Sequence, residues 1–182
     1  MDPLRVEVSA GSRRYSVHIQ HGLTARLGEL VRHVRAGSRV FVVSSPLVWR
    51  LHGRDLGRAL ASPDPILIPD GERNKQLPTV VRIYDALARA QADRGSGIVA
   101  IGGGVIGDMA GFAAASYLRG IGLVHVPTTL LAQVDSAIGG KVGVNHPLGK
   151  NLIGAFYQPD LVVVDPALLS TLPRREFRTG LY

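Results

Sequence analysis

A glycine-rich turn in the middle of the chain constrains the fold more than any other sequence feature. Residues 97–101 (GIVAI) form an apolar run typical of a buried strand, and an alanine-rich helical segment occupies residues 106–118. Between them, Gly102, Gly104 and Gly107 have the G-x-G-x-x-G spacing. In this arrangement, backbone N–H groups at a helix start can bind a phosphate, because no side chain blocks its approach. The sequence therefore predicts an α/β domain with an anion site at this turn.

The rest of the chain alternates between strand and helix patterns. Apolar runs predict a hairpin at 4–8 and 15–20, and strands at 39–43, 66–68, 97–101, 123–126 and 161–164. Periodic or capped segments predict helices at 23–34, 46–60, 78–93, 106–118 and 127–133, and a helical turn at 166–170. This alternation predicts a Rossmann-like parallel sheet with helices on both faces. Residues 139–160 show no clear element, so we expect an irregular, functional stretch there.

Composition and charge exclude several other classes of protein. The chain of 182 residues has no Cys, which excludes a disulfide framework and thiolate metal sites. It has no signal-peptide pattern and no apolar run of about 18 residues, so we expect a cytoplasmic protein without a membrane partner. The net charge is +7, but the arginines are dispersed along the sequence. We therefore expect a solvated basic surface that attracts a small polyanionic substrate, and no nucleic-acid partner.

Polar groups follow two other expected strands. The segment 69–75 (PDGERNK) offers Asp70, Glu72 and Lys75, whose carboxylates suit ribose hydroxyls and whose ammonium suits a phosphate. Thr128 and Thr129 supply hydroxyl groups after the strand at 123–126, at the edge where α/β sheets bind ligands. Each segment also has an ordinary structural interpretation, as a solvated turn and as a helix cap.

The segment 134–151 combines charges and amides with many glycines. Asp135, Lys141, Lys150 and Asn151 lie in it, and its two ammonium groups suit a substrate that carries phosphate and carboxylate. An ordinary Rossmann dehydrogenase would show an acidic residue about 20 residues after the glycine turn. Here that strand ends in His125-Val126-Pro127-Thr128, which disfavours that class but not dinucleotide binding. None of the six His has metal-ligand spacing.

Taken together, these segments resemble the 3-dehydroquinate synthase family. The matching strings are PDGERNK (69–75), AIGGGVIGDMAGFAAASYLRGI (100–121), VHVPTTLLAQVDSAIGGKVGVNHPLGKNLIGAFYQP (124–159) and STLPRRE (170–176). The resemblance implies a carbon–oxygen lyase of the shikimate pathway. Such an enzyme uses bound NAD and a divalent metal to convert 3-deoxy-D-arabino-heptulosonate 7-phosphate to 3-dehydroquinate with release of phosphate.

The resemblance also implies roles for individual residues. Asp135, Lys141, Lys150 and Asn151 fall where the family gathers the substrate and performs catalysis. The expected NAD-binding residues are Asp70, Glu72, Lys75, Gly103, Gly104, Gly107, Asp108, Thr128, Thr129, Lys141, Lys150 and Thr171.

Two features depart from the family pattern. Ser44-Ser45-Pro46 replaces the usual Thr followed by Asn or Asp, which puts the adenosine contact in doubt. The chain ends at Tyr182, where the family's first metal ligand, a Glu, would follow. We therefore expect an NAD-binding α/β domain at 1–172 and, at 173–182, the start of a truncated helical metal-binding domain. The zinc or cobalt is expected only in the full-length homodimer, and the truncated chain is expected to be inactive alone.

Other functions stay open on the sequence alone. Related sugar-phosphate cyclases, such as inosose and valiolone synthases, share the glycine turn and fold. Metal-dependent polyol dehydrogenases share the architecture but generally lack a loop of the type seen at 140–151 (GKVGVNHPLGKN). A stand-alone nucleotide-binding module is the non-enzymatic alternative.

Overall fold

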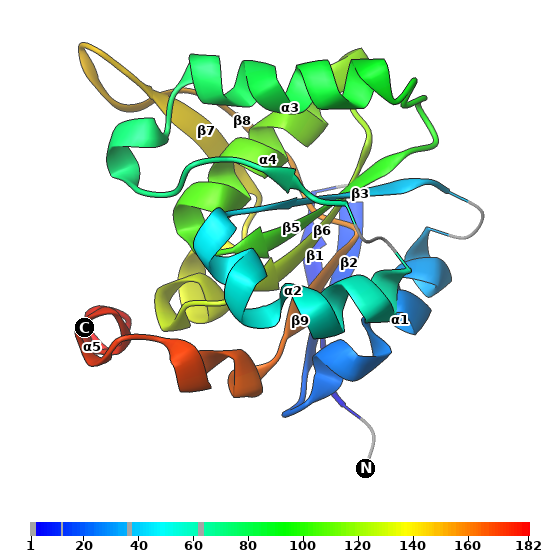
Figure 1. Cartoon of the computed structure of the whole chain (residues 1–182), viewed down its shortest axis with the longest axis vertical. Helices are drawn as coiled ribbons and strands as arrows, with labels where there is room; N and C mark the ends of the chain where they lie inside the picture. The colour runs from blue at the N-terminus through cyan, green and yellow to red at the C-terminus, as the bar shows by residue number, and fades with distance from the viewer. Residues whose placement is uncertain (1–2, 12, 36–37, 62–63) are drawn as a thin grey trace.

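A mixed sheet forms the centre of the molecule (Figure 1). The computed structural model describes residues 3–11, 13–35, 38–61 and 64–182. The strand order is β1-β2-β9-β6-β5-β3-β4; β1 is antiparallel to β2, and the other neighbouring strands are parallel. The strands are β1 (Leu4–Ala10), β2 (Arg13–Ile19), β3 (Val40–Ser44), β4 (Ile66–Leu67), β5 (Gly97–Gly102), β6 (Gly122–Pro127) and β9 (Leu161–Val164). The expected hairpin and parallel sheet are confirmed.

Helices cover both faces of this sheet, as the sequence predicts. One face packs against α3 (Leu77–Arg89) and α4 (Gly104–Ser116). The other packs against η1 (Leu23–Arg26), α1 (Leu27–Val34), α2 (Pro46–Leu60) and η5 (Pro166–Thr171). Successive residues of β5 alternate between the two cores: Ile98 and Ala100 contact the first, Val99 and Ile101 the second. This two-sided burial explains why β5 is apolar throughout.

Residues 139–160 are more regular than the sequence suggests. The expectation of an irregular stretch is wrong, because β7 (Lys141–His146) and β8 (Gly149–Phe156) form an antiparallel hairpin apart from the main sheet. Close packing on α4 explains it: a Cβ at Gly111 would lie 2.4 Å from Cγ1 of Val142. Within the hairpin, a Cβ at Gly143 would lie 2.5 Å from the Ile153 oxygen. Gly111 and Gly143 therefore allow close packing of the hairpin on α4 and of its two strands on each other.

Some helix boundaries also differ from the expected ones. The helix expected at 78–93 ends at Arg89, and Gln91 takes a left-handed backbone conformation with φ 52°. The helix expected at 127–133 instead continues into η4 (Ala132–Ser136), which is π-helical. The remaining elements are η2 (Glu72–Asn74), η3 (Tyr117–Arg119) and α5 (Arg174–Thr179), and α5 confirms the helix start expected after Pro173.

Candidate functional site

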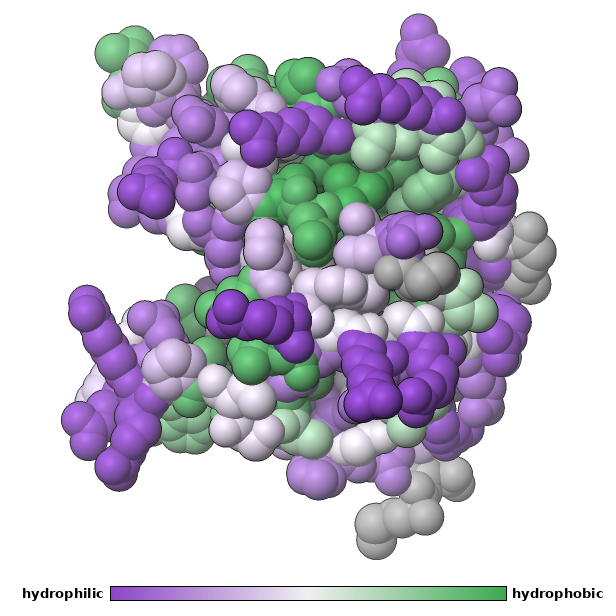
Figure 2. Space-filling model, in the orientation of Figure 1, coloured by the Kyte–Doolittle hydropathy of each residue, from purple (hydrophilic) through white to green (hydrophobic). Residues whose placement is uncertain are grey.

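The carboxyl ends of the parallel strands meet at one edge of the sheet, which faces left in Figure 1. β3, β5, β6 and β9 end there at Ser44, Gly102, Pro127 and Val164. Loops that follow these strands are consequently brought together, as in other open α/β sheets that bind ligands at this edge. Figure 2 shows that the surface is hollowed on the same side, above α5. We therefore built the candidate site from the residues of this edge.

The glycine turn ends in an uncapped helix N-terminus. The Gly107 N–H donates to the Gly103 oxygen at 3.0 Å, so the preceding N–H groups of residues 104–106 have no acceptor within α4. In the described part of the chain, no side chain caps this helix. A Cβ at Gly102 would lie 2.6 Å from Cβ of Ile106, so only glycine fits the turn. Unpaired N–H groups and the helix dipole together make this end suited to an anion.

The π-helical turn brings the side chain of Ser136 toward the glycine turn. The Ala137 N–H bonds to the Ala132 oxygen, five residues back, at 3.2 Å. This wider winding places Ser136 next to Gly104, where an added Cβ would lie 2.9 Å from Ser136 Oγ. Among the described residues, that buried hydroxyl has no hydrogen-bond partner. Since buried polar groups are normally paired, Ser136 Oγ is available to a ligand at the helix N-terminus.

A buried ion pair joins three segments beside this helix. The ammonium of Lys75, whose residue is 5% exposed, pairs with the Asp108 carboxylate of α4 and donates to Asn151 Oδ1 of β8 at 2.5 Å. Burial raises the pKa of the Asp108 carboxyl, and the adjacent Lys75 opposes part of that rise. Asp135 and Glu72 add negative potential and raise this pKa further. The site thus concentrates charge in a partly water-excluded place, as catalytic and binding sites often do.

Asn145 extends this cluster to the loop before α3. Its N–H donates to the Lys75 oxygen at 2.8 Å, and its Nδ2 donates to Glu72 Oε1 at 2.8 Å. Its Oδ1 accepts the Asn151 N–H at 2.8 Å, where Asn151 has a left-handed φ of 53°. The β7–β8 hairpin and the loop at 69–75 are therefore fixed to each other.

A cavity of about 530 Å³ opens between α4, the π-helical turn and the hairpin. Four of the residues predicted for the site line it: Asp108, Asp135, Lys141 and Asn151. This volume is in the range of small-molecule sites. Lys150, by contrast, is exposed on β8 and is not among the residues that line the cavity.

The other predicted residues lie along the same edge. The Thr128 N–H donates to the Gly102 oxygen at 2.9 Å, and Thr129 Oγ1 accepts the Ala132 N–H at 3.2 Å, so Thr129 caps the following helix. Asp70 accepts the N–H of Gly71 at 2.7 Å in the turn after β4. Thr171 lies on η5, with its hydroxyl 2.8 Å from His52 Nε2, and no described contact joins it to the cavity.

Ser44 and Ser45 have internal roles. Ser44 Oγ donates to the Ile101 oxygen at 2.8 Å, and Ser45 caps α2.

Sequence reasoning missed two residues that hold this edge together. Gln133 Nε2 donates to the Pro127 oxygen at 3.2 Å and to the Asp165 oxygen at 3.0 Å, which joins the ends of β6 and β9. The Asp165 carboxylate is fully buried and accepts N–H groups of Gly22, Thr24 and Ala167. No local motif marks either residue, because their partners are distant in sequence.

His125 lies directly behind the glycine turn. It is 4% exposed on β6, and a Cβ at Gly107 would lie 3.5 Å from its ring atoms. Burial lowers the pKa of His125 from 6.5 to about 4, so the ring is neutral at pH 7.

Among the described residues, no three His, Cys, Asp or Glu side chains lie together as a metal site. No helix there has both the length and the apolar character needed to cross a membrane.

Comparison with known families agrees with this geometry. The model of the family described as 3-dehydroquinate synthase N-terminal matches residues 65–179. The chain belongs to this family. It is 52% identical over 181 residues to the 3-dehydroquinate synthase of Citrifermentans bemidjiense, with 97% of this chain and 50% of the relative covered. It is 51% identical over 178 residues to that of Azotobacter vinelandii, with 97% and 48% covered. The chain thus spans about half the length of the curated relatives it matches.

Solved structures of related cyclases have the same fold as this 3-dehydroquinate synthase family member. A 2-deoxy-scyllo-inosose synthase complexed with carbaglucose-6-phosphate, NAD+ and Co2+ has a TM-score of 0.89 and 29% identity, with 98% of this chain and 49% of that chain covered. The 2-epi-5-epi-valiolone synthase from Streptomyces hygroscopicus subsp. jinggangensis 5008, with NAD+ and Zn2+ bound, has a TM-score of 0.84 and 33% identity, with 98% and 50% covered. A glycerol dehydrogenase from Schizosaccharomyces pombe, with a TM-score of 0.65 and 20% identity, shares the fold over 88% of this chain and 39% of that chain.

Buried His125 predicts a specific pH dependence of stability. Its pKa is about 4 in the folded chain and 6.5 when unfolded, so the folded state binds fewer protons between these values. Stability therefore falls as the pH drops from 6.5 toward 4. Between pH 7 and pH 5 this group alone costs about 2 kcal/mol. Denaturant unfolding at both pH values should show that wild type loses about 2 kcal/mol more than His125→Gln does.

The quantity compared is the decrease in unfolding free energy between pH 7 and pH 5, so the test is valid even if His125→Gln is less stable at both pH values. An equal decrease in the two proteins would contradict the neutral, buried state of His125.

Proposed function

We propose that this chain is the NAD-binding part of a 3-dehydroquinate synthase. The proposed reaction converts 3-deoxy-D-arabino-heptulosonate 7-phosphate to 3-dehydroquinate with release of phosphate. The observation that carries the proposal is the cavity lined by Asp108, Asp135, Lys141 and Asn151, which lies beside an uncapped helix N-terminus. The identity of about half of all residues to curated 3-dehydroquinate synthases supports the choice of substrate.

The carboxyl edge of the sheet would hold the cofactor. We propose that the turn at Gly103, Gly104 and Gly107 binds the pyrophosphate through the N–H groups at the start of α4, which no side chain caps among the described residues. We propose nearby contacts for the rest of NAD from Asp70, Glu72, Lys75, Asp108, Thr128, Thr129, Lys141, Lys150 and Thr171. When bound, NAD would take a hydride from the substrate and return it, without net oxidation.

The charged residues of the cavity would bind and orient the substrate. Lys141 at the start of β7 presents an ammonium for a phosphate or carboxylate, and Asn151 presents an amide. Asp135 supplies a carboxylate on the opposite wall, at the end of the π-helical turn. The assignment of Lys150 to the substrate rests on the family resemblance, since it does not line the cavity. These four roles stay predictions.

The described residues do not provide a ligand set for a divalent metal, because no three His, Cys, Asp or Glu side chains lie together among them. The roles proposed for this chain therefore involve no metal. The assignments to the lyase class, to the cytoplasm and to a homodimer stay predictions. So do the domain boundary after residue 172, the inactivity of the chain alone, and the absence of nucleic-acid and membrane partners.

Related cyclases are the second candidate function. The solved inosose and valiolone synthases are 29% and 33% identical to this chain, so a different sugar-phosphate substrate is the alternative. Identity of 51–52% to 3-dehydroquinate synthases favours the first proposal over this one. The dehydrogenases share less sequence with this chain and support only the fold.

NAD binding tests the cofactor part of the proposal on the chain itself. Titration calorimetry should show binding of NAD to the 182-residue chain, and Gly104→Val should weaken it at least tenfold. The reason is that a side chain at this position occupies the pyrophosphate space and meets Ser136. About 1.4 kcal/mol corresponds to this factor.

Gly95→Ala is the matched control, because its Cβ meets Asp93 only at an ordinary 3.4 Å and it lies at the other end of β5. It should bind NAD as wild type does. No binding of wild type at millimolar NAD, or equal binding by Gly104→Val, would refute the site.

Activity can be tested in a chimaera. Residues 1–179 of this chain would replace the matching part of the Citrifermentans bemidjiense enzyme. We expect phosphate release from 3-deoxy-D-arabino-heptulosonate 7-phosphate without net NADH, and a loss of about tenfold to a hundredfold in kcat/KM for Lys141→Met. Arg82→Met, on the exposed side of α3, is the control and should keep full activity.

The alternatives give different results in the same assay. Net accumulation of NADH would favour a dehydrogenase. Activity only on a hexose 6-phosphate would favour an inosose synthase.

A further inference from the structure

The opposite edge of the sheet carries a second polar pocket. β5, β6 and β9 begin there, at Gly97, Gly122 and Leu161. A cavity of about 390 Å³ lies at these strand starts and is lined by Arg13, Arg14, Arg35, Arg94, Tyr157 and Asp160, among others. Because β5 has six residues, this edge is about 20 Å from the glycine turn. The pocket is therefore separate from the candidate NAD site.

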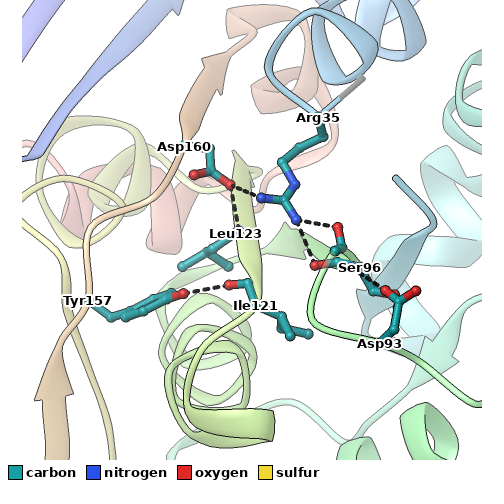
Figure 3. A network of polar contacts seen from close by, with 8 residues as sticks. Arg35, Asp93, Ser96, Ile121, Leu123, Tyr157 and Asp160 are labelled. Carbon is teal, nitrogen blue, oxygen red and sulfur yellow. Dashed lines mark hydrogen bonds and ion pairs between the residues drawn. The ribbon is translucent and has the colours of Figure 1, made fainter. Parts of the chain in front are cut away.

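Arg35 forms a fixed wall of this pocket (Figure 3). Its guanidinium donates to the Gly95 and Ser96 oxygens at 2.5 Å and 2.8 Å, and lies 3.6 Å from Asp160 Oδ2. A Cβ at Gly122 would lie 2.3 Å from Arg35 Cζ, so the glycine admits this side chain. Arg35 is thus held in place by the backbone.

Three other arginines of the pocket, Arg13, Arg14 and Arg94, form no salt bridge with a carboxylate of the described residues. Burial raises the pKa of the Asp160 carboxyl, and the charges of Arg35 and Arg13 oppose part of that rise. Asp160 is the carboxylate that lines the pocket, and it already accepts the Leu123 N–H at 3.1 Å and faces Arg35. Arg13 lies over the Tyr157 ring, 5.2 Å from its centre, which orients it. Concentrating these like charges costs free energy that a bound anion would recover.

The donors available in this pocket indicate which class of ligand it would bind. The backbone N–H groups of Gly120, Ile121 and Gly122 are already paired, with Tyr117, Ala114 and Ser96 oxygens. The guanidinium groups that line the pocket are its charged donors, and their planar forks match phosphate oxygens. A concave pocket also suits a small molecule better than a nucleic-acid backbone, which would need a continuous basic stripe.

We propose that this pocket binds a small phosphorylated anion through Arg13, Arg14 and Arg94, with Arg35 as its fixed wall. Four arginines that are far apart in the sequence line this one pocket. The fold brings residues 13–14, 35 and 94 together at the strand starts. The site is independent of NAD binding and of the proposed reaction.

Pyrophosphate is the probe for the test. Calorimetry at constant ionic strength should show pyrophosphate binding to the 182-residue chain. The double variant Arg14→Gln/Arg94→Gln should weaken it at least tenfold, which corresponds to about 1.4 kcal/mol. Arg82→Gln/Arg89→Gln, with the same loss of charge on the exposed side of α3, should change it less than twofold.

Two further measurements test whether pyrophosphate binds at this pocket. In Gly104→Val, pyrophosphate binding to this pocket should persist, because the glycine turn is at the other edge. A double-stranded oligonucleotide should not bind through the same arginines.

Four results would overturn the proposal. The first is that wild type does not bind pyrophosphate at 10 mM. The second is that pyrophosphate affinity falls equally in the two double variants, and the third is that it is lost in Gly104→Val. The fourth is that an oligonucleotide binds more tightly than pyrophosphate and that Arg14→Gln/Arg94→Gln abolishes its binding.

Discussion

The ammonium of Lys75 lies between the Asp108 carboxylate and the Asn151 amide, and this contact joins three segments that are distant in the sequence. Lys75 directly follows the short helix η2, Asp108 lies in the first turns of α4, and Asn151 belongs to the hairpin. A buried charge without a partner is costly, so each segment depends on the position of the other two. Asp108 lies on the helix that begins at the glycine turn, and it also lines the cavity, so this ion pair supports both parts of the candidate site.

Close packing makes this ion pair possible. The hairpin lies directly on α4 because Gly111 leaves room for Val142, and Asn145 fixes the hairpin to the backbone of Lys75. On the other side of α4, the π-helical turn carries Ser136 to the glycine turn. The helix N-terminus is therefore surrounded by elements that cover it without capping it, which is what an anion site requires.

The sequence predicts the main sheet and its edge better than it predicts the elements that cover them. Apolar strands, the glycine turn and the threonines after β6 are local patterns with a direct physical reading. The hairpin escapes such reasoning because Gly143 interrupts its valines and its stability comes from contacts with α4. The π-helical turn and the pocket at Arg35 escape it too, since tertiary contacts, not neighbouring residues, determine them.

Lys75 and Asp108 act as one buried unit, and a double-mutant cycle measures the coupling between them. Unfolding free energies would be measured for wild type, Lys75→Met, Asp108→Asn and the double variant. Each single change should cost about 3 kcal/mol, because it leaves a buried charge or its partner alone. The double variant should cost at least about 1.5 kcal/mol less than the sum of the two. Costs that add to within about 0.5 kcal/mol would contradict the account.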